Sequence, residues 1–236
     1  MIRRVAVGAG LVTALVAGAL AGPAVPGVAA PSAEEVASAG VLVQSDFPSG
    51  WTQSTRGQTS DAAQLAAGEK IASCAPFVAV SKANRRNPRA KSPNFDHEQS
   101  DVTNTVSLYP STAKAVAAIG MLADARLPGC LEKLFSSVFE RQLAKDAGVR
   151  NQIVSVDTSI APVADVRIGD QAVAYQGTVD VLLKHGSTQT IGLGVVTARV
   201  GRALVGYSWT SDTDISSTLQ PAIVASVQRL QAAQSA

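Results

Sequence analysis

The segment Gln171–Thr210 reads QAVAYQGTVDVLLKHGSTQTIGLGVVTARVGRALVGYSWT, and it decides the fold class of this chain. Apolar side chains alternate with polar or small ones in three runs, which is the pattern of strands that bury one face. The expected strands are Gln171–Lys184, Thr188–Arg199 and Ala203–Thr210. Short turns at Gly186 and at Gly201 join them, so the three runs predict an antiparallel meander.

In each expected strand a set of apolar side chains shares one parity and so one face. These residues are Val173, Tyr175, Val179, Val181 and Leu183, then Ile191, Leu193 and Val195, then Val205, Tyr207 and Trp209. Four glycines interrupt the runs, namely Gly177, Gly192, Gly194 and Gly206. Glycine weakens a strand unless another group approaches the backbone closely. A packed helix, a bend in the sheet or a bound ligand would each account for them.

Helical patterns lie on both sides of the meander in the sequence. Apolar residues recur at helical spacing in 31–45, 60–74, 111–122, 131–143 and 219–230. The expected strands upstream are Phe95–Tyr109 and Ile153–Ile160, and Lys82–Asn94 is expected to be a loop. Local hairpins without regular strand–helix–strand alternation predict the α+β class. We expect a curved antiparallel sheet with a C-terminal three-stranded meander and helices packed on one face.

The first thirty residues have the layout of a secretory signal peptide. Arg3 and Arg4 precede an uncharged run, Val5–Ala21, and small residues lead to Ala30. The alternative is an uncleaved membrane anchor, because the run is near the lower limit for spanning a bilayer. No cysteine stands at the junction, which argues against a lipid anchor. We therefore expect residues 1–30 to be a signal peptide and residues 31–236 to form a single domain of a secreted or envelope protein.

The charge balance says little about partners. Without Arg3 and Arg4 the chain has 18 basic and 18 acidic residues, so no electrostatic argument favours nucleic acid. No stable membrane insertion is expected after signal cleavage, and the oligomeric state is left open.

Cys74 and Cys130 are the only cysteines. A thiol nucleophile needs a histidine partner, and a zinc site needs about four clustered ligands. His97 and His185 are the only histidines, so neither alternative is favoured. Outside the cytosol two such cysteines are expected to form a disulfide, which would clamp two helices together.

Catalytic motifs are absent from the sequence. It contains no G-x-S-x-G elbow, no phosphate-cradling glycine loop and no dinucleotide or calcium motif. His185 lies in a Lys-His-Gly turn and His97 in a strand-like segment, which favours exposed positions without catalytic roles. We expect a protein that is not an enzyme and that carries no cofactor or metal.

Two groups of residues are candidates for binding. Aromatic residues commonly line apolar pockets, and the candidates are Trp51, Tyr175, Tyr207 and Trp209, with core packing as the alternative. The expected loop Lys82–Asn94 carries five basic residues, among them Arg85, Arg86, Arg89 and Lys91, which suit either a solvated surface or a patch for an anionic or envelope ligand.

Several short motifs carry a resemblance to a known family. They are Asp46-Phe47-Pro48-Ser49-Gly50-Trp51, Ile168-Gly169-Asp170-Gln171-Ala172-Val173-Ala174-Tyr175, Val200-Gly201-Arg202-Ala203-Leu204-Val205, and the two cysteines in helical surroundings. With these, residues 34–233 resemble actinobacterial exported proteins related to the extracellular sensor domain of PknH-type mycobacterial serine/threonine kinases. The resemblance implies a sensor-like α+β fold with a ligand-binding cleft outside the membrane. The chain departs from the family in lacking a kinase domain, a later membrane span, a lipobox cysteine and further disulfides.

These observations together predict a secreted, non-enzymatic ligand-binding protein of the cell envelope or exterior. Its ligand is expected to be a small apolar or amphipathic molecule, or another envelope component. A protein-docking module and a hydrolase without recognisable motifs are the alternatives. A ligand binder requires a closed apolar cleft, whereas a docking module requires a shallow apolar surface patch.

Overall fold

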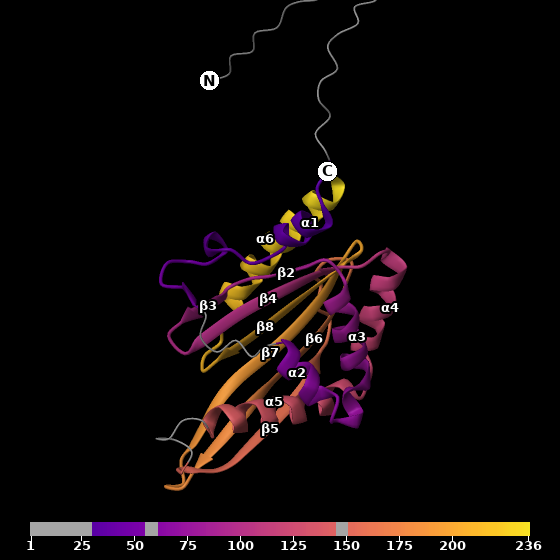
Figure 1. Cartoon of the computed structure of the whole chain (residues 1–236). Coiled ribbons are helices and arrows are strands. Elements are labelled where there is room, and N and C mark those ends of the chain that lie inside the picture. The colour runs from indigo at the N-terminus through magenta and orange to yellow at the C-terminus, as the bar shows by residue number, and fades with distance from the viewer. Residues whose placement is uncertain (1–29, 55–60, 145–150) are drawn as a thin grey trace, which may run out of the picture. The chain divides into compact units, whose positions relative to one another are not determined.

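An antiparallel sheet of eight strands runs through the computed structural model, which describes residues 30–54, 61–144 and 151–236 (Figure 1). The strand order is β1-β3-β4-β8-β7-β6-β5, and β2 also pairs with β4. The strands are β1 Thr52–Ser54, β2 Arg89–Lys91, β3 Asn94–His97, β4 Ser100–Leu108, β5 Ile153–Val163, β6 Gln171–Leu183, β7 Thr188–Val200 and β8 Ala203–Ser211. The expected meander is confirmed as β6–β7–β8, and each strand ends within one residue of its expected end.

Six α-helices accompany the sheet within the described residues. They are α1 Ala33–Ala39, α2 Asp61–Gly68, α3 Ala75–Arg86, α4 Thr112–Leu122, α5 Leu127–Leu143 and α6 Ser216–Ser235, with short 3₁₀ turns at Gln44–Asp46 and Ala72–Cys74. Local sequence explains several of the ends. Ser32 and Glu35 form a reciprocal capping box at the start of α1, and the Ser111 side chain caps α4. The predicted α+β class is confirmed.

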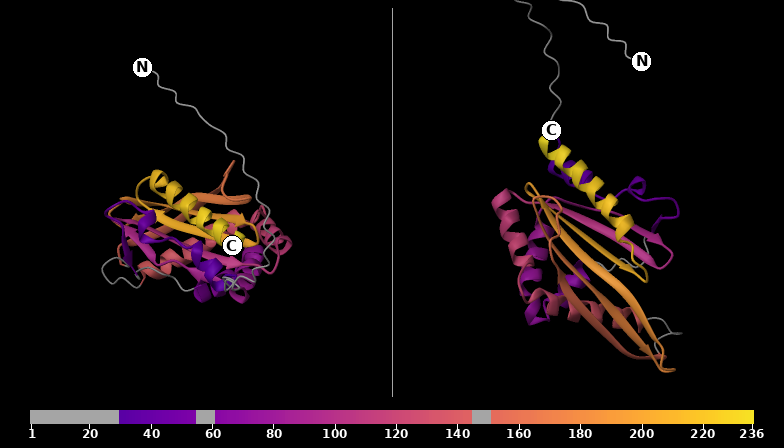
Figure 2. Two further views of the ribbon diagram at one scale, coloured as in Figure 1. Left: turned by 90° about the horizontal axis from the view of Figure 1, so that it is seen from above. Right: turned by 180° about the vertical axis from the view of Figure 1, so that it is seen from behind.

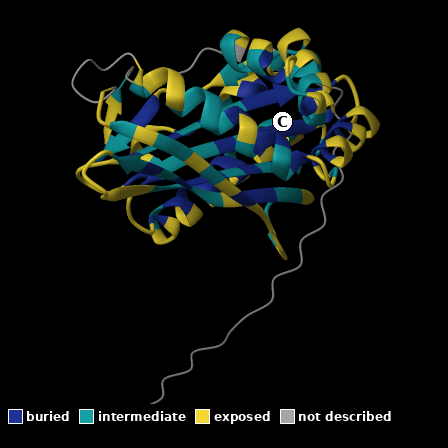
Figure 3. Cartoon of the chain, turned by 90° about the horizontal axis from the view of Figure 1, so that it is seen from below, coloured by how far each residue is buried: buried dark blue, intermediate teal, exposed yellow. Residues whose placement is uncertain are grey.

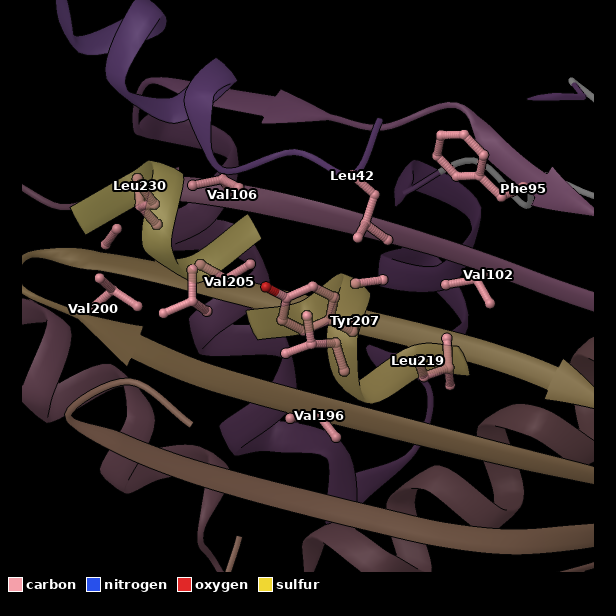
Figure 4. Close-up of a cluster of buried hydrophobic side chains, with 14 of the residues drawn as sticks. Leu42, Phe95, Val102, Val106, Val196, Val200, Val205, Tyr207, Leu219 and Leu230 are labelled. Carbon is pink, nitrogen blue, oxygen red and sulfur yellow. The ribbon is translucent and has the colours of Figure 1, made fainter. Parts of the chain in front are cut away.

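The structure places helices on both faces of the sheet, where the sequence led us to expect one (Figure 2). Because side chains alternate along a strand, Tyr207 and Leu204 of β8 point to opposite faces. One face, here called the α6 face, packs against α1 and α6 (Figure 4). The other, here called the cleft face, packs against α3, α4 and α5. The expected strands carry apolar residues at both parities, such as Leu204 and Val205, and this is why both faces are buried (Figure 3).

Three upstream segments differ from the sequence expectation, the first being the expected strand Phe95–Tyr109, which is the hairpin of β3 and β4. The expected loop Lys82–Asn94 is wrong, because α3 continues to Arg86 and β2 occupies Arg89–Lys91. Strand β2 exists because its residues pair with Thr105–Ser107 of β4, a tertiary contact without a local signal. The expected helix 60–74 is instead α2, which ends at Gly68, followed by a 3₁₀ turn. Ser60, the first residue of that expected helix, lies outside the described residues.

Two of the four strand glycines are explained by another group that lies too close to the glycine backbone to leave room for a side chain. A side chain at Gly177 would overlap the carbonyl oxygen of Ser159 on β5. A side chain at Gly194 would overlap the indole ring of Trp209 on β8. Gly206 differs, because a Cβ atom placed there would have room: its nearest neighbour would be Thr197 Oγ1, at 3.8 Å.

Pro31–Ala236 form one compact unit. The expected signal peptide falls outside the described residues, except for Ala30. Among the helices of the described residues, none combines the length and the apolar character needed to cross a bilayer.

Candidate functional site

A cleft of about 220 Å³ opens between the cleft face of the sheet and the helices α2, α3 and α5. Its floor is formed by side chains of β4, β6, β7 and β8, and its walls come from the helices. The volume is slightly below the roughly 300–1,000 Å³ of typical small-molecule pockets. The cleft therefore suits a small ligand.

The floor of the cleft is partly polar. Thr105 of β4, Thr197 of β7 and Ser208 of β8 contribute hydroxyl groups around Gly206. None of these three hydroxyls makes a hydrogen bond to any part of the chain that the structure describes. Because Gly206 has no side chain, this part of the floor stays open.

The walls are predominantly apolar. Their apolar members are Leu65, Phe77, Val80, Leu122, Leu127 and Leu131. Across the floor, Val173 and Val195 extend the apolar surface over β6 and β7. The charged side chains that line the cleft within the described residues are Arg85 and Arg89, both exposed to solvent.

Tyr175 is the predicted aromatic residue whose side chain lies at the cleft. Its ring is buried on the cleft face, and its hydroxyl donates to the carbonyl oxygen of Leu122 at 2.7 Å. Burial raises the pKa of this hydroxyl, so it stays protonated and joins the end of α4 to β6.

The other three predicted aromatic residues point away from the cleft. The strand backbone at Tyr207 borders the cleft, but its side chain lies on the α6 face, 2.9 Å from Ser226 Oγ. Trp209 packs over Gly194 on that same face. Trp51 stacks on Phe47 with ring centroids 4.9 Å apart. The four residues therefore do not form one site, and three of them take the packing role that was the alternative.

The motif Asp46–Trp51 is structural in this chain. Asp46 is buried and forms a bidentate ion pair with Arg229 of α6, with N–O distances of 2.6 and 2.8 Å. Phe47 also stacks on Phe95 of β3 at 4.6 Å. The motif thus fixes the segment before β1 against α6 and β3. Its residues, which contribute to the family resemblance, serve packing in this chain and do not line the cleft.

Neither histidine lies at the cleft. His97 stacks on Trp51 with centroids 5.5 Å apart. His185 Nδ1 lies 3.1 Å from Ser187 Oγ, but both residues are exposed in the turn between β6 and β7. No group of three potential metal-ligating side chains occurs within the ranges that the structure describes.

Phe77 and Leu131 were not assigned to a site from the sequence, whereas Arg85 and Gly206 were considered there as possible ligand contacts, with a solvated loop and sheet packing as the alternatives. Helices α3 and α5 are about fifty residues apart in the chain and converge only by tertiary packing, so their periodicity signals burial without indicating a cleft. The sequence feature that could have indicated the cleft was Gly206, a glycine inside a strand that no turn requires.

A partly buried carboxylate lies farther along the cleft face. Asp101 of β4 accepts a hydrogen bond from the Thr210 hydroxyl and pairs across the sheet with Asp96. Burial raises the pKa of Asp101 above its ordinary 3.8, and the nearby Asp96 charge adds to the shift, while the Thr210 hydrogen bond opposes it.

We expect Asp101→Asn to raise the melting temperature slightly at pH 7 and to leave it unchanged below about pH 3.8. The folded state holds this proton more tightly than the unfolded state. Its stabilising contribution is therefore complete below the unfolded pKa and is lost as the pH rises through the raised folded pKa. Thermal unfolding of both proteins from pH 3 to pH 7 measures the difference, with Asp212→Asn, an exposed carboxylate, as control. A destabilised variant at pH 7 would contradict this account.

Cys74 and Cys130 form the expected disulfide, with Cα atoms 4.8 Å apart. Both side chains are fully buried in the core of the cleft face. The bridge joins the turn that precedes α3 to helix α5. Helices α3 and α5 supply most of the cleft walls.

Fold and cleft together define an α+β domain with an open antiparallel sheet and a ligand-sized cleft on one face. The chain is similar to the extracellular domain of PknH from Mycobacterium tuberculosis, with 14% identity, a TM-score of 0.45, and coverage of 84% of this chain and 98% of that one. This is the same domain that the sequence motifs resemble. Mog1p, a Ran-binding protein of Saccharomyces cerevisiae, gives 11% identity, a TM-score of 0.17, and coverage of 63% and 92%. No family model and no curated protein matches the chain, so its function is argued from its own residues.

Proposed function

We propose that this protein is a secreted, non-enzymatic ligand-binding domain of the cell envelope or exterior. Its ligand is a small apolar or amphipathic molecule held in the cleft between the sheet and α3 and α5. The observation that carries the proposal is a cleft with apolar walls above a floor that Gly206 leaves open.

The lining of the cleft supports this proposal. Binding sites for small molecules are mostly apolar, with a few polar groups that orient the ligand. Here leucine, valine and phenylalanine side chains form most of the walls, and the floor holds three hydroxyls with no hydrogen-bond partner among the described residues. The disulfide beside the cleft suits an oxidising compartment, in agreement with the signal-like leader.

A docking module has less support. The large apolar side chains that are exposed within the described residues are Val43, Val116, Met121, Val154, Val163 and Val224. They are distributed over a loop, α4, β5 and α6, whereas docking sites are contiguous apolar patches of several hundred Å².

We expect Gly206→Leu to abolish ligand binding while the fold is retained. The new side chain would occupy the open floor, and Gly206 does not have a positive φ, so its backbone accepts a side chain. Native mass spectrometry of protein purified from its own host should show a bound small molecule, at least tenfold depleted in the variant.

Gly206→Ala is the matched control, since it fills less of the floor and is expected to retain most of the bound molecule. Circular dichroism checks that both variants fold. An undiminished bound mass in folded Gly206→Leu would place the ligand elsewhere and refute the assignment to this cleft.

A further inference from the structure

We propose that the cleft selects anionic amphiphiles, with the acidic head at Arg85 and the apolar tail along the helical walls. This inference rests on the proposed function and adds the charge and the orientation of the ligand.

The charged side chains that line the cleft, within the described residues, are all positive. Arg85 and Arg89 line the cleft, and no aspartate or glutamate does so in the part of the chain that the structure describes. Arg85 lies in the last turn of α3, is exposed, and has no ion-pair partner among the described residues. An anionic group at this position would meet a guanidinium without a competing carboxylate.

The two arginines reach the cleft from different elements. Arg89 belongs to β2 and is the cross-strand partner of Ser107 on β4. Residues of β4 alternate between the two faces, so Ser107 shares a face with Thr105, which forms part of the floor. The arginines therefore converge from α3 and from β2 on the solvent side of the cleft.

Polarity changes along the cleft from this charged rim to the walls. Phe77, Leu127 and Leu131 offer only apolar surface, which matches an alkyl or ring-containing tail. A planar guanidinium binds carboxylates and phosphates through paired hydrogen bonds. A ligand with one acidic end and one apolar end matches both parts of the lining.

A structural role for Arg85 is the competing explanation. A basic residue in the last turn of a helix interacts favourably with the helix dipole. In that case Arg85→Gln would lower the stability of α3 without changing which ligands bind.

Isothermal titration calorimetry with four amphiphiles of equal chain length tests the inference on the folded, oxidised protein. The probes are octanoate, octyl phosphate, 1-octanol and octyltrimethylammonium. We expect at least one anion to bind about fivefold or more tightly than 1-octanol, the effect of one partly solvated charge contact, and the cation to bind most weakly. This preference should shrink at 0.5 M salt, because exposed charges are screened. The two anions distinguish a carboxylate head from a phosphate head.

Arg85→Gln should remove most of the preference for the anion and leave the affinity for 1-octanol unchanged. Arg86→Gln, the exposed neighbour on α3 that does not line the cleft, should keep the preference. Equal binding of anion and alcohol, or preference for the cation, would overturn the inference while the proposed function stands. Absence of binding by all four probes, together with absence of a bound molecule in host-purified protein, would overturn the proposed function itself.

Discussion

Replacing Cys74 and Cys130 together by alanine is expected to lower the free energy of unfolding by roughly 4 kcal/mol. The disulfide spans 56 residues, and closing a loop of that length restricts the unfolded chain by about this amount in the entropic model. For a domain of this size the loss corresponds to a fall in melting temperature of roughly 8–16 °C. Thermal unfolding followed by circular dichroism measures it.

The double alanine variant avoids leaving a single buried thiol. Its far-ultraviolet spectrum at low temperature should match that of the oxidised protein, because the helices and strands keep their backbone hydrogen bonds. A reductant should destabilise the unmodified protein and leave the double variant unaffected. An unchanged melting temperature in the variant would show that the bridge contributes little to stability.

Arg229→Met is expected to destabilise the fold by about 3 kcal/mol, which lowers the melting temperature by roughly 6–12 °C. The substitution leaves the Asp46 carboxylate, with 3% of its side chain exposed, without its cation. It also removes the donors to the carbonyl oxygens of Ala39 and Val41. Removing one partner of a buried pair costs about 3–5 kcal/mol, and the lower end applies because 35% of the Arg229 side chain is exposed.

A double-mutant cycle separates the ion pair from general packing. Asp46→Leu combined with Arg229→Met should recover part of the loss, because no unpaired charge then remains buried. Lys82→Met is the matched surface control. It breaks a pair with Glu69 in which both side chains are about half exposed, and it should leave the melting temperature nearly unchanged. Equal losses from Lys82→Met and Arg229→Met would contradict the assigned role of burial.

The strongest sequence patterns predicted the parts of the fold that local chemistry determines. Alternation with glycine turns located β6, β7 and β8 almost to the residue, and helical spacing predicted a helix in the region of α1. These signals are local because strand pleating and helical spacing depend on residues a few positions apart. The two cysteines likewise indicated their own pairing, since few alternative partners were present.

The candidate site was much less predictable, because it is formed by elements distant in the chain. Tyr175 was identified, whereas Tyr207 shares its residue type and its position within a strand but points to the α6 face. Parity within one strand does not reveal which face holds a cleft when helices cover both faces. The arginines at Arg85 and Arg89 were visible as a basic segment, but their convergence on the cleft depends on α3 and on the pairing of β2 with β4.

The contacts between α1 and α6 have a consequence for biosynthesis. Arg229 and Ser226 on the last helix bond to the carbonyl oxygens of Ala39 and Gly40 at the end of the first. A polypeptide leaves the ribosome amino end first, so α1 emerges long before its partner α6, and this half of the interior cannot close until α6 has been made. Until α6 has been synthesised, a nascent chain therefore leaves the apolar residues of the α6 face, Phe47 and Phe95 among them, without their full packing.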